Sequence, residues 1–158
     1  MTLAKLKEEL AQMAHKQVID LVLDMYTKVP AAKDFLDIFV SLDIEKMAGK
    51  YKNQISRDLK VKFDSSPRDV SARKLIRDVR KMGIDELSVE LELFYAECAY
   101  LNMEEWGYWE AYSYSDAMQK MFYDALEKIE KNGWQEKYSD RITTLKKKGG
   151  KYGYFIEL

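Results

Sequence analysis

Two residue types that commonly do chemistry occur once each in this chain, as Cys98 and His15. One cysteine cannot close a disulfide within the chain, and one cysteine with one histidine supplies too few donors for a zinc site. A Cys/His nucleophilic pair is not expected either. Cys98 falls on an apolar stripe, which favours a small buried side chain over a reactive thiol. We therefore expect no bound metal and no cofactor.

Carboxylates are the next candidates for chemistry. Glu86, Glu90 and Glu97 fall between the apolar stripes of one expected helix, within reach of neighbouring helices. A carboxylate pair could act in hydrolysis or bind metal, but carboxylate-bridged di-iron bundles need Glu-x-x-His motifs, and Gln12 stands three positions before His15. The sequence also has no Walker-type phosphate loop, dinucleotide glycine fingerprint or serine elbow. We expect a protein that is not an enzyme.

Charge is strongly polarised along the chain, although the net charge is only −1. Residues 46–82 hold twelve Lys or Arg against four Asp, whereas residues 84–130 hold two Lys against twelve acids. The near-neutral total gives no general reason to expect nucleic acid or an anionic membrane as a partner. The local charges still require an explanation.

A basic face is predicted on the helix that follows Pro67. Arg73, Arg77, Arg80 and Lys81 lie on one side of it, opposite an apolar stripe. Such a face could track phosphates, since nucleic-acid affinity comes largely from Lys and Arg. Basic residues opposite an apolar stripe are, however, the default pattern for the solvated side of a packed helix, and the acidic half of the chain is a counterweight. We take the second interpretation and keep weak nucleic-acid binding as an alternative.

The segment WGYWEAYSY, residues 106–114, gathers five aromatic residues at a helix junction. Trp106, Trp109 and Tyr112 recur every three residues, so their rings can point the same way. They could close the end of the core. They could also form a partner or ligand surface, and the acids Glu105 and Glu110 would then favour a cationic ligand or a basic peptide. Small-molecule binding or an enzyme at this junction is the second alternative function.

Helical periodicity dominates the elements that would position these residues, and only seven Gly and two Pro interrupt it. About eight amphipathic helices are expected, and the first two should form a short hairpin. In order they are a segment with Leu3, Leu6 and Leu10, then Val18 to Val29, AAKDFLDIFVS after Pro30, and Asp43 to about Phe63. They continue with SARKLIRDVRKMG, in which Gly83 supplies the stop, and with about 85–103, 115–131 and 134–147.

The helix at about 85–103 should be the central one. Its start, LSVELELFY, also alternates like a strand, but the length of the apolar pattern favours a helix. It carries two apolar stripes on nearly opposite sides, one with Leu87, Leu91, Phe94, Cys98 and Leu101, the other with Val89, Leu93, Ala96 and Tyr100. A helix with two apolar faces is packed on both sides.

Several stretches together resemble a group of bacterial helical proteins known as a domain of unknown function. The stretches are LAKLKEELAQMAHKQVIDLVLDMY, SARKLIRDVRKMGIDEL, MFYDALEKIEKNGWQEKYSDRITTL and KYGYFIEL. The resemblance implies a single all-α domain without an assigned activity, and it carries over no catalytic residue. Ala14 departs from the pattern, because a capping residue would usually stand there, so the second helix should begin frayed or one residue later.

These observations predict an all-α fold, a single compact domain over residues 1–158, with helical hairpins packed around the central helix. The expected function is a cytoplasmic protein-interaction or scaffold module with a protein partner or self-association. The N-terminus does not have the pattern of a secretion signal, and the apolar stretches are interrupted by acids before bilayer length. No membrane partner is therefore expected.

Overall fold

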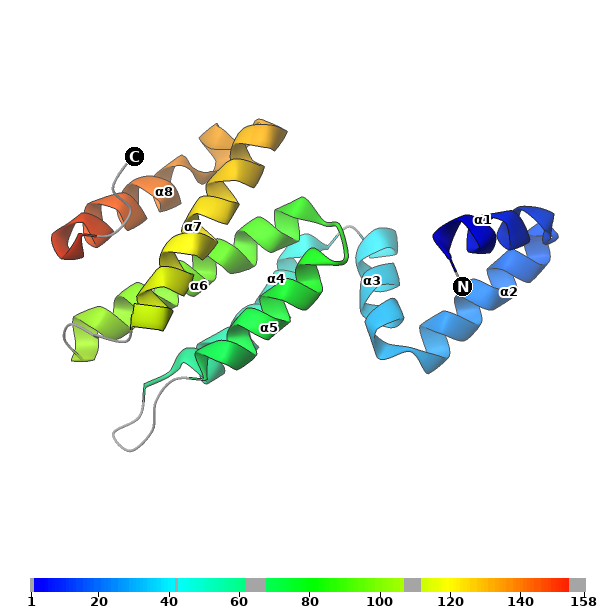
Figure 1. The fold of residues 1–158 in the computed structure, drawn as a ribbon, viewed down its shortest axis with the longest axis horizontal. Coiled ribbons are helices and arrows are strands. Elements are labelled where there is room, and N and C mark those ends of the chain that lie inside the picture. The colour runs from blue at the N-terminus through cyan, green and yellow to red at the C-terminus, as the bar shows by residue number, and fades with distance from the viewer. Residues whose placement is uncertain (1, 42, 62–67, 107–111, 154–158) are drawn as a thin grey trace. The chain divides into compact units, whose positions relative to one another are not determined.

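The computed structural model describes residues 2–41, 43–61, 68–106 and 112–153 (Figure 1). Within these ranges the chain forms eight α-helices, a short 3-10 helix and no strand, which confirms the all-α prediction. The elements are α1 (Leu3–Gln12), α2 (His15–Lys28), α3 (Pro30–Ser41), α4 (Ile44–Leu59), α5 (Asp69–Arg80), α6 (Asp85–Trp106), α7 (Tyr112–Asn132), α8 (Gln135–Gly149) and η1 (Gly150–Tyr152).

Contacts within the chain divide it into two compact units, residues 1–43 and residues 44–158. We call them the N-terminal unit and the C-terminal unit, and each is described by itself. The expectation of one domain over 1–158 stays a prediction.

Helix α6 is the centre of the C-terminal unit, as predicted. It contacts α4, α5, α7 and α8, and Figure 1 shows it between the α4–α5 pair and the α7–α8 pair. Leu87 and Leu91 from the first predicted stripe are fully buried, as are Val89 and Leu93 from the second. The prediction of two packed faces is therefore confirmed for this part of the helix.

The middle of α6 is more completely enclosed than two stripes require. Tyr95 and Ala99 belong to neither predicted stripe, yet both are fully buried, because helices lie on more than two sides of α6. Cys98 is half-buried, and burial raises the pKa of its thiol to about 12. The thiol is therefore protonated at neutral pH, which makes it a poor nucleophile. The prediction of a buried stripe is wrong at Leu101, because 49% of this residue is exposed.

Two glycines end helices in the way the sequence predicts. Gly83 follows α5 with φ of 72°, and its N–H donates to the carbonyl of Arg80 at 3.1 Å. Gly133 separates α7 from α8 with φ of 72°. Left-handed backbone costs little without a Cβ, so each glycine reverses the chain and satisfies a terminal carbonyl.

Two helix ends differ from the prediction, one because of a residue on another helix and one because of a neighbouring residue. Helix α4 ends at Leu59 rather than near Phe63, and the buried amide Nδ2 of Asn102 on α6 donates to the Leu59 carbonyl at 2.7 Å. Helix α2 begins at His15, although Ala14 has no capping side chain. The Oε1 atom of Gln17 accepts from the Ala14 N–H at 2.8 Å, which satisfies one terminal donor.

Helices α2 and α3 form the main contact of the N-terminal unit. The Tyr26 hydroxyl donates to Oδ1 of Asp37 at 2.9 Å, and Nζ of Lys33 donates to Oδ2 of Asp37 at 2.7 Å. The Lys33–Asp37 pair lies within α3, whereas Tyr26 links the two helices through Asp37 and through Nζ of Lys33, which donates to the Tyr26 hydroxyl at 3.0 Å. No residue of α1 or α2 is buried, so apolar packing within this unit is slight.

Candidate functional site

The aromatic junction falls largely outside the described residues. Trp109 and Glu110 lie outside them, as do the side chains of Trp106 and Tyr112. Glu105 is described and exposed at the end of α6. The choice between a core plug and a ligand surface stays a prediction.

The predicted basic face of α5 is partly neutralised by two aspartates of the same helix. Nη2 of Arg73 donates to Oδ2 of Asp69 at 2.8 Å, and Nζ of Lys81 donates to Oδ1 of Asp78 at 2.8 Å. The Lys81 ammonium lowers the pKa of the Asp78 carboxyl. Arg77 is exposed. These pairs reduce the positive charge that a phosphate would meet.

Arg80 binds internal acids instead of facing solvent with Arg77. Its Nε donates to Oε1 of Glu92 at 2.7 Å, and its Nη2 donates to Oδ2 of Asp124 at 2.7 Å. Lys128 also binds Glu92, at 2.8 Å to Oε1 and 3.0 Å to Oε2. The four side chains thus join α5, α6 and α7, and we call them the Glu92 cluster.

Burial governs the electrostatics of the Glu92 cluster. Glu92 has no exposed surface, and burial raises the pKa of its carboxyl although Lys128 and Arg80 oppose that shift. An isolated carboxylate at this depth would be very costly, so the two cations offset part of the cost of burying Glu92. Sequence reasoning missed Glu92. The available signal was its place between Leu91 and Leu93 on a helix expected to be packed on both sides.

A polar cavity of about 400 Å³ lies beside the Glu92 cluster. Its lining is Arg80, Asp85, Lys120, Asp124, Glu127, Lys128 and Lys131. Lys120 pairs with Asp124 at 3.0 Å, and Lys131 pairs with Asp85 at 3.3 Å. Four cations in the lining meet three acids, and Glu92 adds the fourth acid. The charges balance, so the cavity has no excess charge to select an anion or a cation.

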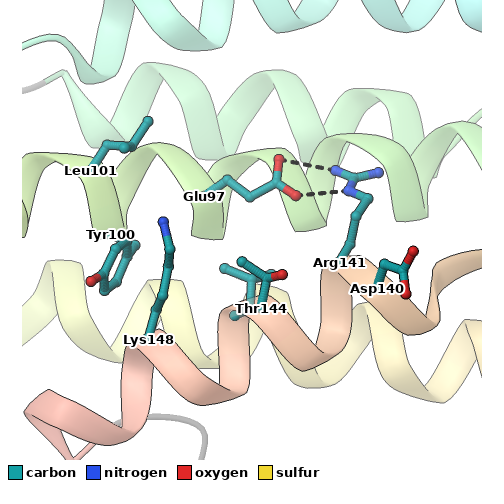
Figure 2. A pocket seen from close by; sticks show the side chains of 8 residues that line it. Glu97, Tyr100, Leu101, Asp140, Arg141, Thr144 and Lys148 are labelled. Carbon is teal, nitrogen blue, oxygen red and sulfur yellow. Dashed lines mark hydrogen bonds and ion pairs between the residues drawn. The ribbon is translucent and has the colours of Figure 1, made fainter.

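A second charged cluster joins the other side of α6 to α8 and α4, and we call it the Arg141 cluster. Arg141 donates to Glu97 through Nε at 2.7 Å and through Nη2 at 3.1 Å, as Figure 2 shows. Its Nη1 donates to Oε2 of Glu90 at 2.9 Å, and Lys52 binds the same oxygen at 2.5 Å. Burial opposes ionisation of Glu90, but Lys52 and Arg141 outweigh it and lower the pKa of the carboxyl.

Acid–base chemistry by Glu90 and Glu97 is disfavoured by this arrangement. Arg141 binds both carboxylates, and Lys52 holds Glu90 ionised. A general acid needs a carboxyl that stays protonated near neutral pH, which is the opposite of the shift at Glu90. In the described part of the chain, no three His, Cys, Asp or Glu residues converge as metal ligands. The absence of a bound metal stays a prediction.

A groove of about 280 Å³ runs between α6 and α8 beside the Arg141 cluster (Figure 2). It is lined by Glu97, Tyr100, Leu101, Asp140, Arg141, Thr144, Leu145 and Lys148. The Tyr100 hydroxyl donates to Oε1 of Glu104 at 2.6 Å, and burial with this carboxylate raises the pKa of Tyr100 to about 12. Nζ of Lys148 lies 4.9 Å from the centre of the Tyr100 ring. The groove offers one exposed apolar wall, at Leu101, and among its charged groups Glu97, Arg141 and Lys148 each contact another side chain.

The N-terminal unit carries the largest exposed apolar surface among the described residues. Ten large apolar side chains of this unit are at least 37% exposed: Leu3, Ile19, Leu21, Val22, Leu23, Met25, Val29, Phe35, Phe39 and Val40. In the C-terminal unit only Val70, Leu101 and Tyr123 are in this class among the described side chains. We call the exposed side chains of the first set the N-terminal apolar surface.

No described helix is both long enough and apolar enough to cross a membrane. No family model, no curated protein and no solved structure matches this chain. The resemblance to the bacterial helical proteins therefore stays an expectation, and function has to be argued from the residues themselves.

Proposed function

We propose that this chain is a non-enzymatic protein-interaction module that binds its partner through the N-terminal apolar surface. One observation carries the proposal: α1 and α2 have no buried residue, yet the unit exposes ten large apolar side chains. Exposed apolar area of this extent is typical of a protein-binding surface, because water leaves it when a partner covers it.

The charged groups of the C-terminal unit also support the proposal, because they form ion pairs between helices. Glu92, Glu90 and Glu97 are bound by cations from neighbouring helices, so they serve to hold the helices together. Arg80, which the nucleic-acid alternative needs on an open face, is one of those cations. The single protonated thiol agrees with a reducing compartment, and we place the module in the cytosol.

A site-specific photo-crosslinker tests the proposal in cells. The crosslinker replaces Leu23 or Phe39 in the N-terminal apolar surface, and Val70 in a control chain. Val70 is 64% exposed and apolar but lies in α5, so it matches the two test positions in exposure and polarity. We expect discrete protein adducts from positions 23 and 39 that position 70 does not give. Equal adduct patterns at all three positions would contradict the proposal.

A further inference from the structure

One side of α2 is wide and carries no Asp, Glu, Lys or Arg. With about 100° between successive residues, the arc from Leu21 round to Leu23 takes in Met25, Val22 and Ile19 and no Asp, Glu, Lys or Arg. This arc covers more than half of the helix. Helix α3 covers only part of it, since Leu23 is 57% exposed and Met25 is 45% exposed.

Helix α3 has the same character. The arc that holds Phe35, Phe39 and Val40 contains no charged residue, and Phe39 is 71% and Val40 81% exposed. Lys33 and Asp37 lie outside this arc and pair with each other at 2.7 Å. The α2–α3 pair therefore presents uncharged apolar faces on both helices.

Helices of this length need a packing partner. The helices α1, α2 and α3 have 10, 14 and 12 residues, and isolated helices shorter than about 12–15 residues are marginal in water. Without Leu3, which lies on α1, the exposed side chains of residues 19–40 present on the order of 800 Å², and one side of a standard protein interface also covers about 800 Å². The surface is thus large enough for a stable interface.

The chemistry of the faces selects the partner. An uncharged apolar face offers no ion-pairing group to select an unlike partner, but it is complementary to a second uncharged apolar face. Residues 1–43 have seven acids and five bases, a net charge of −2, so repulsion between two copies is weak. Two helix pairs related by a twofold axis bury their apolar faces as a four-helix bundle.

We propose that the partner is a second copy of this chain, with the α2–α3 pairs of two chains packed as a four-helix bundle. This inference rests on the proposed function and names the occupant of the N-terminal apolar surface.

Sedimentation equilibrium of the purified 158-residue chain, from about 1 to 100 µM, tests the inference. We expect a mass of twice 18.6 kDa for the parent chain. Leu23→Asp and Phe39→Asp should each lower the mass to 18.6 kDa, because a carboxylate in the interface would be buried without a partner. The control Val70→Asp should keep the doubled mass.

Far-UV circular dichroism during thermal unfolding checks that the variants keep the helices of residues 1–43. Tryptophan fluorescence would not report on those helices, since all three tryptophans belong to residues 44–158. A variant that fails this check is replaced by the milder Leu23→Ser or Phe39→Ser. A monomeric parent chain, or a dimer unaffected by the changes at 23 and 39, overturns the inference. If a monomeric chain still gives adducts with other proteins from positions 23 and 39, self-association fails while the proposed function stands. If those positions give no specific adduct, the proposed function fails as well.

Discussion

Arg80 and Arg77 lie on the same helix, and replacing each by methionine separates an internal ion pair from a solvated basic face. Methionine keeps the length of the apolar stem, so the change mainly removes the guanidinium. Arg80 binds the fully buried Glu92 and also Asp124, while Arg77 is exposed. The two variants carry the same change of charge and differ in what the arginine touches.

The expected loss follows from what remains around Glu92. Removing one partner of a buried ion pair typically costs about 3–5 kcal/mol, because the other charge stays buried. Lys128 still forms an ion pair with Glu92, and the Arg80 side chain is 28% exposed, so the lower end of this energy range applies. We expect Arg80→Met to lower the free energy of unfolding by about 3 kcal/mol. Arg77→Met should change it by less than about 0.5 kcal/mol, as for a surface residue.

Urea denaturation followed by tryptophan fluorescence measures both values for the C-terminal unit, where the tryptophans lie. Equal losses for the two variants would refute the assignment of Arg80 to the core. The nucleic-acid alternative makes a separate prediction on the same proteins. It requires Arg77→Met to weaken binding to DNA or RNA at moderate salt and to reduce its salt dependence.

Two further predictions concern protonation. The lowered pKa of Glu90 means that its ion pairs stabilise the fold fully above the ordinary value of 4.5, and that this stability is lost as the pH falls through the lower folded pKa. The stability gap between the parent chain and Glu90→Gln, from urea melts at several pH values, should therefore shrink below about pH 4.5, and a constant gap would count against the Arg141 cluster. Because the pKa of Cys98 is raised to about 12, a disulfide reagent should label the native thiol at pH 8 about a thousandfold more slowly than the urea-unfolded thiol. Similar rates in both states would show that the Cys98 thiol is accessible and that burial does not raise its pKa.

Much of the fold could be predicted because helix periodicity is a local property. The two stripes of α6 identify a helix packed on both sides, and Gly83 identifies the end of α5, since each signal needs only a few neighbouring residues. Leu101 is an exception, because its burial cannot be predicted from local periodicity. It continues the stripe of Leu87 and Leu91, but whether a helix covers that last turn depends on where α8 lies, and there a groove remains.

The candidate sites were less predictable than the fold. The sequence identified Glu90 and Glu97 as acids within reach of other helices, but it could not show that Arg141, more than forty residues later, would bind both. Arg80 belonged to the basic face by its spacing, yet its partner Glu92 was not identified. Side chains this long can reach either solvent or a neighbouring helix, and periodicity does not distinguish the two.

The sequence by itself determined the helices, the central position of α6 and the opposite charge of the two halves, because each depends on residue order along one segment. Only the tertiary structure decided which charges pair, since the acids of α6 meet bases from α4, α5, α7 and α8 only after those helices pack. It also decided that no residue of α1 or α2 is buried. Apolar periodicity shows that a face will be buried, but the packing partner is set by the fold or by a second molecule.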